Sequence, residues 1–370
     1  MSAARDTAVA IWQAGVDAVG GYAAVTRALA ADDGQPPDRI LAVGKAAGTM
    51  MQAALDHFGE VPALVVTKDG HGDGLPDSVN LIEASHPVPD ARSLQAGRAL
   101  RIAVEVMPEG SRLLLLVSGG ASALAEDPVE GKTLEDLTAL NRQLLSAGLD
   151  IGAMNAERRK FSRIKGGGLL SHFRGGSVRV LAISDVPGDD LGVIGSGIGS
   201  ASEQHTFDFN SRIVASNAHA RAAAVAEAET LGLPVLADEE CLHNDLTILT
   251  RRLAPRLRDM APGVMVLGGE PTVVLPEKPG RGGRNQALAL ALAREIAGSK
   301  DITIVVGGTD GTDGPTDAAG AVVDGTTWGP GAADALEQAD SGSYLAEKSA
   351  LLETGPTGTN VMDLLIALRA

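Results

Sequence analysis

A lysine in a glycine turn is the first residue whose position suggests chemistry. Gly44 and Lys45 stand between an apolar run that ends at Val43 and a helical pattern that begins at Ala46. A helix N-terminus offers free backbone N–H groups and a partial positive charge, and Lys45 adds a full charge. Such a turn is suited to bind an anion, although a tight turn with a solvated lysine has the same sequence.

A second turn of small residues follows another apolar run. It combines two glycines with two hydroxyls, in Ser118, Gly119, Gly120 and Ser122. Small residues let backbone N–H groups approach an oxyanion or a phosphate closely, and the hydroxyls can donate hydrogen bonds as well. The alternative is a turn that needs its glycines only for their backbone angles.

Two further loops carry charged residues. Lys165 lies with Arg163 beside three glycines, a composition that suits a polyphosphate but also fits a flexible surface loop. Asp185 directly follows an apolar run, where a carboxylate can hold Mg²⁺ or accept the proton of a substrate hydroxyl. Asp189 and Asp190 can equally be turn residues or helix caps.

Arg284 presents a local conflict. It stands in Gly280–Gln286, which opens a helical pattern, and the helix macrodipole disfavours a cation at that end. A ligand anion shared by Arg284 and the helix N-terminus would remove the conflict, because arginine binds carboxylate or phosphate in a bidentate way. Asn285 belongs to the same candidate anion site. Glu270, in a glycine turn upstream, is a candidate metal ligand.

Two polar loops near the C-terminus complete the candidates. Asp310 and Asp313 follow an apolar run, where carboxylates suggest a metal or a ribose, or only a capped turn. Thr359 and Asn360 lie in the segment TGPTGTN, which we expect to precede the last helix. Either residue can bind phosphate or simply cap that helix.

Several common sites are missing from the sequence. Gly131-Lys132-Thr133 has Glu126 where a P-loop has its first glycine, so an ATP site in this chain is not a P-loop. No GxGxxG spacing follows the first apolar run, so an NAD site is weakly supported. The seven histidines form no close metal pair, and we interpret His86 as structural.

The elements that must position these loops alternate between apolar runs and helical patterns in the first half of the chain. Nearly continuous apolar runs are typical of strands covered on both faces, so this rhythm predicts a parallel sheet with helices on both sides. The predicted strands are Arg39–Val43, Ala63–Thr67, Val79–Ala84, Arg112–Ser118, Arg179–Ser184 and Arg212–Ala215. The predicted helices are an N-terminal amphipathic one, Ala46–Phe58, Asp90–Met107, Thr133–Ser146 and Arg221–Leu231.

The second half predicts a smaller mixed α/β domain. Gly263–Leu267 and Thr272–Leu275 predict an antiparallel pair joined by a tight turn. Ile302–Val306 and Ala321–Val323 add strands, and Asn285–Ala297 predicts a helix. Because few strand signals lie between residues 233 and 263, we place the two domains at residues 1–235 and 236–370.

Composition and charge argue against several classes of protein. The 370-residue chain has a net charge of −16 and a pI near 4.8, without the basic stripe of a nucleic-acid binder. Cys241 is the only cysteine, which rules out an intrachain disulfide and fits a reducing cytoplasm. No signal peptide and no apolar run of about 18 residues is visible. We therefore expect a cytoplasmic protein without membrane or nucleic-acid partners.

Taken together, these loops resemble the glycerate 2-kinase family. The most specific segments are GGRNQ at 282–286, DGPTDAAGA at 313–321 and TGPTGTN at 354–360. The resemblance implies a Rossmann-like domain and a smaller mixed-sheet domain, with the active site in the cleft that separates them. It also implies phosphoryl transfer from ATP to the 2-hydroxyl of D-glycerate, with Lys45, Asp185 and Arg284 as key active-site residues.

In the expected mechanism, Arg284 and Lys45 neutralise charge on the substrate carboxylate and on the transferring phosphoryl group. Asp185 orients the hydroxyl or holds Mg²⁺, and these two roles cannot be separated by sequence. Three rival functions are a hydroxypyruvate reductase, a kinase of a related sugar acid and a non-catalytic sensor of small acids. The family resemblance alone suggests a homodimer.

Overall fold

The computed structural model describes residues 3–31, 34–146 and 157–370, and the chain divides into two compact units. One unit, called here the parallel-sheet unit, comprises Gly20–Ser216 and Gly358–Asn360. The other, called the mixed-sheet unit, comprises Met1–Val19, Asn217–Thr357 and Val361–Ala370. Each unit has its own six-stranded sheet and its own apolar core.

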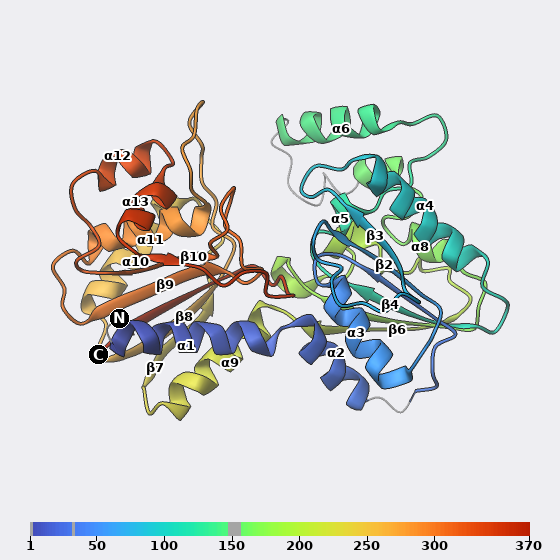
Figure 1. The fold of residues 1–370 in the computed structure, drawn as a ribbon, viewed down its shortest axis with the longest axis horizontal. Coiled ribbons are helices and arrows are strands. Elements are labelled where there is room, and N and C mark those ends of the chain that lie inside the picture. The colour runs from blue at the N-terminus through green and yellow to red at the C-terminus, as the bar shows by residue number, and fades with distance from the viewer. Residues whose placement is uncertain (1–2, 32–33, 147–156) are drawn as a thin grey trace. The chain divides into compact units, whose positions relative to one another are not determined.

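All neighbouring strands of the parallel-sheet unit are parallel, in the order β3-β2-β1-β4-β5-β6 (Figure 1). The strands are β1 (Arg39–Val43), β2 (Ala63–Lys68), β3 (Asn80–Ala84), β4 (Arg112–Val117), β5 (Ser177–Ile183) and β6 (Asp208–Ala215). β1 and β4 are buried along nearly their whole length, because helices cover both faces of the sheet. The predicted Rossmann-like sheet is therefore confirmed, with the six predicted strands in place.

Helices lie on both faces of this sheet. On one face, the odd-numbered residues of β4, such as Leu113 and Leu115, belong to the same apolar core as Leu100 of α4. α2 and α3 contact the sheet strands on the other face. The helices of the unit are α2 (Gly21–Ala30), α3 (Ala47–Phe58), α4 (Ala91–Glu105), α5 (Ala121–Leu124), α6 (Leu134–Ser146) and α8 (Gly168–Ser171). Short 3-10 turns occupy Pro187–Asp189 and Ile194–Gly197.

The mixed-sheet unit has the strand order β11-β10-β9-β12-β8-β7. Its strands are β7 (Val235–Glu240), β8 (Gly263–Gly269), β9 (Ile302–Gly308), β10 (Gly320–Asp324), β11 (Leu351–Leu352) and β12 (Asp363–Arg369). Only β7 and β8 pair in parallel, while β12 runs antiparallel to both of its neighbours. The predicted mixed sheet is thus confirmed.

Helices cover both faces of the mixed sheet as well. α1 (Ala3–Ala18) and α9 (Asn217–Thr230) pack on one face, and α11 (Arg284–Glu295) packs on the other (Figure 1). The remaining helices are α10 (Leu246–Asp259), α12 (Ala332–Glu337) and α13 (Ser341–Glu347). Trp12 of α1 is completely buried, and a Cβ on Gly307 of β9 would lie 3.0 Å from its ring. This contact fixes α1 to the C-terminal sheet.

The two compact units divide the chain differently from the predicted ranges 1–235 and 236–370. Both α1 and α9 belong to the mixed-sheet unit, although they precede residue 235. The reason is tertiary, because α1 packs against α9 and against β9 and β12 from the far end of the chain. A division at a single position in the sequence cannot place α1 and α9 in the same unit as the strands that they pack against.

Two predicted elements are wrong. Thr272–Leu275 is not a strand, since only Thr272 forms a bridge, to Asp245, and Val274 is 85% exposed. β8 already has β12 and β7 on its two edges, so no edge remains for a hairpin partner. The predicted last helix is β12, and the charged stretch before residue 263 contains the unpredicted β7.

No single described helix is long and apolar enough to cross a membrane. The bent pair α1 and α2 passes that test only when both are taken together, by length and composition alone.

Candidate functional site

The turns after β1 and β4 lie next to each other at the point where the strand order reverses. From β1 the chain continues outward to β2 and β3, whereas from β4 it continues to β5 and β6 on the other side. Open parallel sheets bind ligands outside the carboxyl ends of the strands at such a switch point. The backbone N–H of Lys45 donates to the carbonyl of Gly119 at 2.9 Å, and that of Ala46 donates to Ser118 Oγ at 3.0 Å.

The close approach of these turns requires glycine at position 44. Gly44 has a φ of +127°, and a Cβ there would overlap Ser118. The hydroxyl of Thr67, at the end of β2, donates to the Gly44 carbonyl at 3.0 Å. The structure therefore brings together Gly44, Lys45, Ser118 and Gly119, which the sequence offered as two separate candidate turns.

Two further side chains converge on Gly119. A Cβ on this residue would overlap Asp185 Oδ2 and lie 2.5 Å from Asn360 Nδ2. Asp185 comes from the loop after β5, and Asn360 comes from a segment whose Gly358 carbonyl accepts hydrogen bonds from Gly21 and Thr49. Because Gly119 lacks a side chain, a carboxylate and an amide both reach this turn.

Gly120 brings in a residue that the sequence analysis discounted. Its φ is +83°, and a Cβ there would lie 3.1 Å from Lys45 Cγ and 3.2 Å from His86 Nε2. His86 follows β3, so it stands at the same edge of the sheet as the other turns. The signal was present in the sequence, since Ser85-His86-Pro87 follows a strand just as the other candidate loops do.

We call Lys45, His86, Asp185 and Asn360, gathered around Gly119 and Gly120, the switch-point cluster. All four side chains belong to residues that are partly exposed, so a ligand can reach them. The cluster combines a cation, an imidazole, a carboxylate and an amide. This combination can neutralise a phosphate, orient a hydroxyl and hold a divalent cation.

Ser122 points to a different neighbour. Its hydroxyl lies 2.8 Å from the hydroxyl of Ser196, in the 3-10 turn at Ile194–Gly197. The two serines therefore connect the short helix α5 to the segment that follows Asp185 in the chain.

The structure argues against a phosphate contact for Lys165. Its Nζ lies 2.6 Å from Glu126 Oε2, and the two side chains are only 3% and 1% exposed. The glycines beside it are hydrogen-bonded as well, with Gly166 donating to Ser196 and Gly167 to Gly197, each at 2.9 Å. The sequence left open whether this segment binds a polyphosphate or is a flexible surface loop, and in the structure it is a packed loop with a buried ion pair.

In the mixed-sheet unit, Arg284 lies between two carboxylates. Nη1 is 2.6 Å from Glu270 Oε1, and Nε is 2.8 Å from Asp363 Oδ2 at the start of β12. Burial alone would lower the pKa of Arg284, but the charges of Asp363 and Glu270 raise it instead. Arg284 is therefore always charged, and its charge is already balanced within the protein.

Asp313 caps the helix that Arg284 begins. Its two carboxylate oxygens accept hydrogen bonds from the backbone N–H groups of Asn285 and Gln286, at 3.1 and 2.8 Å. Burial raises the pKa of Asp313 to about 7, although these two hydrogen bonds oppose the rise. The helix N-terminus thus has a protein carboxylate where we expected a ligand anion, and Asp313 is a buried cap rather than an accessible ligand.

The remaining candidates are distributed over both units. Asn285 is buried beside Asp363, because a Cβ on Gly308 would lie within 3.4 Å of both side chains. Asp310 is partly exposed and accepts from the N–H and the hydroxyl of Thr312, both at 3.0 Å. Thr359 is 2% exposed, next to Asn360, and neither of them caps a helix since β12 follows.

No three His, Cys, Asp or Glu side chains gather into a metal site within residues 3–31, 34–146 and 157–370. The two candidate ligands, Asp185 and Glu270, lie in different units. Mg²⁺ in nucleotide-dependent enzymes is usually held by only one or two carboxylates together with phosphates and water. A single accessible carboxylate beside a lysine, as at Asp185, fits that pattern.

Two family profiles together match most of the chain. A domain of unknown function, DUF4147, matches residues 7–228, and the MOFRL family matches residues 263–363.

Proteins with similar sequences and structures carry two different names. The chain is 35% identical to the D-glycerate 2-kinase of Thermotoga maritima, over 90% of this chain and 91% of the relative. It is 34% identical to a putative hydroxypyruvate reductase of Agrobacterium vitis, over 88% of this chain and 97% of the relative. The crystal structure of a glycerate kinase from Thermotoga maritima superposes with a TM-score of 0.88 at 32% identity, covering 99% of both chains.

Proposed function

Because the chain belongs to the glycerate 2-kinase family, we propose that it phosphorylates D-glycerate at the 2-hydroxyl with ATP, giving 2-phosphoglycerate and ADP. The observation that carries this proposal is the convergence of Lys45, Asp185 and Asn360 on Gly119 and Gly120 at the switch point of the parallel sheet. Phosphoryl transfer needs mainly positioning and charge stabilisation, and this cluster offers both.

Lys45 is the cation of the switch-point cluster. Its backbone N–H donates a hydrogen bond to the carbonyl of Gly119, which fixes the position of its Cα beside the turn that joins β4 to α5. We assign it to the transferring phosphoryl group, whose charge must be balanced in the transition state. Backbone and hydroxyl groups of Ser118, Gly119 and Gly120 would hold the phosphates.

We assign Asp185 to accept the proton of the substrate hydroxyl or to hold Mg²⁺, beside Asn360, whose side chain also lies next to Gly119. A bound Mg²⁺ would supply charge neutralisation between the phosphates of ATP. The two roles of Asp185 predict different behaviour of an Asp185→Asn variant. If Asp185 is a metal ligand, the activity of Asp185→Asn should be partly recovered at high Mg²⁺ concentration. If Asp185 is the proton acceptor, high Mg²⁺ should not recover it.

Arg284 can bind the substrate carboxylate only if one of its present partners releases it. Glu270 is the candidate, since its side chain is 44% exposed whereas that of Asp363 is 2% exposed. We infer that the substrate carboxylate replaces Glu270 at Nη1. A Glu270→Gln variant should then lower the KM for glycerate, whereas a role of Glu270 as a metal ligand would raise the Mg²⁺ requirement.

The experiment that tests the function is a coupled assay. The purified protein is incubated with D-glycerate, ATP and Mg²⁺, and enolase converts any 2-phosphoglycerate to phosphoenolpyruvate, with no mutase present. Phosphoenolpyruvate formed by the wild type and not by a parallel preparation of Lys45→Ala supports the proposal. ADP without phosphoenolpyruvate would indicate the 3-position or hydrolysis, and no ADP would point to another sugar acid.

A hydroxypyruvate reductase is not favoured. The turn after β1 reads Gly44-Lys45-Ala46-Ala47-Gly48, without the glycine spacing of a dinucleotide-binding turn. Oxidation of NADH with hydroxypyruvate in the absence of ATP would reverse this conclusion. A non-catalytic sensor would bind glycerate without forming ADP.

We also propose a cytoplasmic location and a homodimer. The single cysteine supports the location, and the family resemblance supports the dimer. Light scattering of the purified protein measures its mass in solution and tests the dimer directly.

A further inference from the structure

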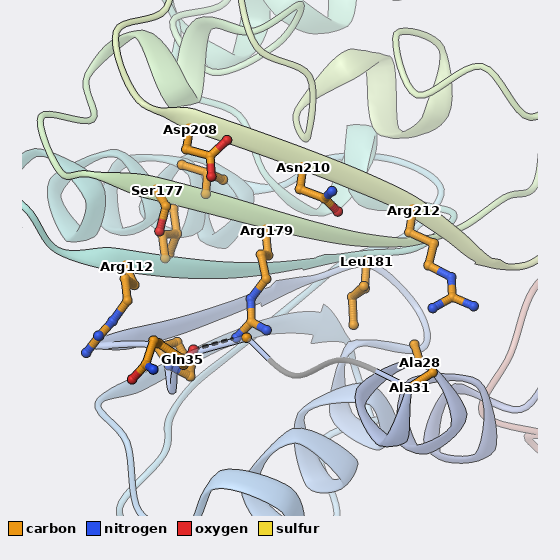
Figure 2. A pocket seen from close by; sticks show the side chains of 14 residues that line it. Ala28, Ala31, Gln35, Arg112, Ser177, Arg179, Leu181, Asp208, Asn210 and Arg212 are labelled. Atoms are coloured by element: carbon orange, nitrogen blue, oxygen red, sulfur yellow. Dashed lines mark hydrogen bonds between the residues drawn. The ribbon is translucent and has the colours of Figure 1, made fainter.

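A polar pocket lies in the parallel-sheet unit, away from the switch-point cluster. It has a volume of about 540 Å³ and opens over β4, β5 and β6 beside the end of α2 (Figure 2). Arg112, Ser177 and Asp208 are the first residues of these strands, whereas the switch-point cluster follows the last residues of its strands. The pocket shares no lining residue with that cluster.

The sheet face in this pocket is polar, which is unusual for a parallel sheet with helices on both sides. The strand register places Ser177 beside Asp208, Arg179 beside Asn210, and Leu181 beside Arg212. On the opposite face of β5, Val178 and Val180 are buried in the core. The polar residues are therefore confined to one face, where α2 leaves part of the sheet uncovered.

Arginine dominates the charge of this face. Arg112, Arg179 and Arg212 line the pocket, and Asp208 is the one carboxylate among the lining residues in the described part of the chain. The remainder of a chain with a net charge of −16 would repel anions, so three arginines in one pocket concentrate positive charge locally.

The three arginines differ in how they are held. Arg112 pairs with Asp38 at 3.1 Å, and Arg179 donates to the Gln35 carbonyl at 3.0 Å with its guanidinium over the ring of Phe58. The side chain of Arg212 makes no hydrogen bond or ion pair with the residues that the structure describes. Figure 2 shows the guanidinium groups of Arg179 and Arg212 directed from the strands into the space beside α2.

We propose that this pocket binds a small phosphorylated hydroxy compound, with its phosphate on Arg179 and Arg212 and its hydroxyls on Asn210, Ser177 and Asp208. Guanidinium groups match the geometry of phosphate oxygens and form charge-assisted hydrogen bonds with them. Amide, hydroxyl and carboxylate groups are complementary to sugar or polyol hydroxyls. The volume lies in the range of pockets for small ligands, about 300–1,000 Å³.

The test measures the binding of orthophosphate and of ribose 5-phosphate by calorimetry, on four proteins. Wild type and Arg251→Gln should bind both probes equally, because Arg251 is an exposed arginine on α10. Lys45→Ala should lose only the anion that binds at the kinase site and should keep the binding that depends on Arg212. Arg212→Gln should bind both at least about 10-fold more weakly, since it loses a charge-assisted hydrogen bond pair. Binding lost in Lys45→Ala but retained in Arg212→Gln would place the anion at the kinase site and overturn the proposal.

A further variant separates the phosphate from the rest of the ligand. Asn210→Ala should weaken the binding of ribose 5-phosphate and leave the binding of orthophosphate unchanged. Equal affinity for the two probes in every protein would overturn the assignment of the hydroxyls.

Asp32 and Asp33 stand between the lining residues Ala31 and Gly34 in the sequence and lie outside the described residues. Replacing both by Ser removes two negative charges and should leave phosphate binding as tight or tighter, so weaker binding would contradict the proposal.

β6 is also an edge strand, so a second copy of the chain is the competing occupant of this face. Light scattering distinguishes the two. If Arg212→Gln keeps the mass of the wild type and binds phosphate more weakly, the ligand pocket is supported. If the wild type binds no phosphate and Arg212→Gln has a different mass from the wild type, the face is an interface between copies.

Discussion

The backbone N–H of Lys45 donates to the carbonyl of Gly119 at 2.9 Å, which ties the turn after β1 to the turn after β4. It extends the pairing of β1 with β4 beyond the ends of the two strands, at the point where the strand order of the sheet reverses. It also means that the main chain, and not a side-chain contact, fixes where the Lys45 side chain begins. Substitution of Lys45 should therefore change the charge of the site while leaving the turn in place.

We expect Lys45→Ala to lower kcat by about 10²–10³-fold, the usual effect of removing one group that stabilises transition-state charge. The melting temperature should stay close to that of the wild type, because the hydrogen bond to Gly119 uses only the backbone. Steady-state kinetics of glycerate phosphorylation measure the effect, with the exposed Lys300→Ala as the control. Near-normal turnover of Lys45→Ala would refute the assigned role.

Gly119→Ala should disrupt the site without removing any functional group. The added methyl would overlap Asp185 Oδ2 and approach Asn360 Nδ2, so both side chains must move. Displacements of about 1 Å in a phosphoryl-transfer site can reduce the rate about 10²-fold. Gly329→Ala is the matched control, because a Cβ at residue 329 makes only ordinary contacts, at 3.5 Å or more. Equal activity of the two variants would show that Asp185 and Asn360 do not need their present positions.

Much of the fold could be predicted because buried parallel strands have a distinctive sequence pattern. Arg39–Val43 was predicted as a strand and has the same bounds in the structure, since apolar residues occupy both of its faces. The same pattern fails for Asp363–Arg369, because a short apolar run is compatible with a buried helix as well as a strand. Only its pairing with β8 and β9, distant in sequence, determines that it is a strand.

The candidate loops could be located from the sequence, but their partners could not. Each loop follows a strand, so the parallel topology places several of them at one edge of the sheet. Which residue meets which depends on contacts that no local pattern encodes. Lys165 pairs with Glu126, and Asp313 caps the helix at Asn285. His86 lies beside Gly120, a neighbour that its position after a strand does not identify.

The buried pair of Lys165 and Glu126 predicts a rescue experiment. Lys165→Met alone should destabilise the protein by about 3–5 kcal/mol, because it removes the ion-pair partner of a carboxylate that is only 1% exposed. The double variant with Glu126→Leu should recover most of that loss, since an apolar pair of similar volume often replaces a buried ion pair without cost. Urea denaturation measures both values.

Activity of that double variant then tests the role first expected for Lys165. A structural ion pair predicts a KM for ATP close to that of the wild type in the double variant. A KM raised about 10-fold or more, in a protein of restored stability, would instead support a phosphate contact by Lys165.

Arg284 allows the same separation of stability from activity. Arg284→Ala leaves Asp363, which is 2% exposed, without its counter-charge and should cost on the order of 3 kcal/mol. Adding Asp363→Asn removes the isolated charge and should restore stability. The double variant should stay inactive if Arg284 binds substrate, whereas recovery of activity together with stability would mean that Arg284 only balances Asp363 and Glu270.

Asp313 predicts how stability depends on pH. Its pKa in the folded protein is raised to about 7 by burial, whereas an aspartate in an unfolded chain has a pKa of about 3.9. Between these values the folded state binds more protons than the unfolded state, so this residue's contribution is complete below about pH 4 and is lost as the pH rises through about 7. The free energy of unfolding should therefore fall with rising pH by up to about 1.4 kcal/mol per unit from this group alone.

Asp313→Asn isolates this term, because asparagine can still accept a hydrogen bond at the start of α11 but does not titrate. The unfolding free energy of the wild type, minus that of Asp313→Asn, should be largest near pH 4.5 and smallest near pH 7.5. Asp317→Asn, which changes an exposed carboxylate of the same loop, should give a difference that varies much less over this range. A flat difference for Asp313→Asn would mean that Asp313 stays ionised when folded, held by the two backbone N–H groups that it caps.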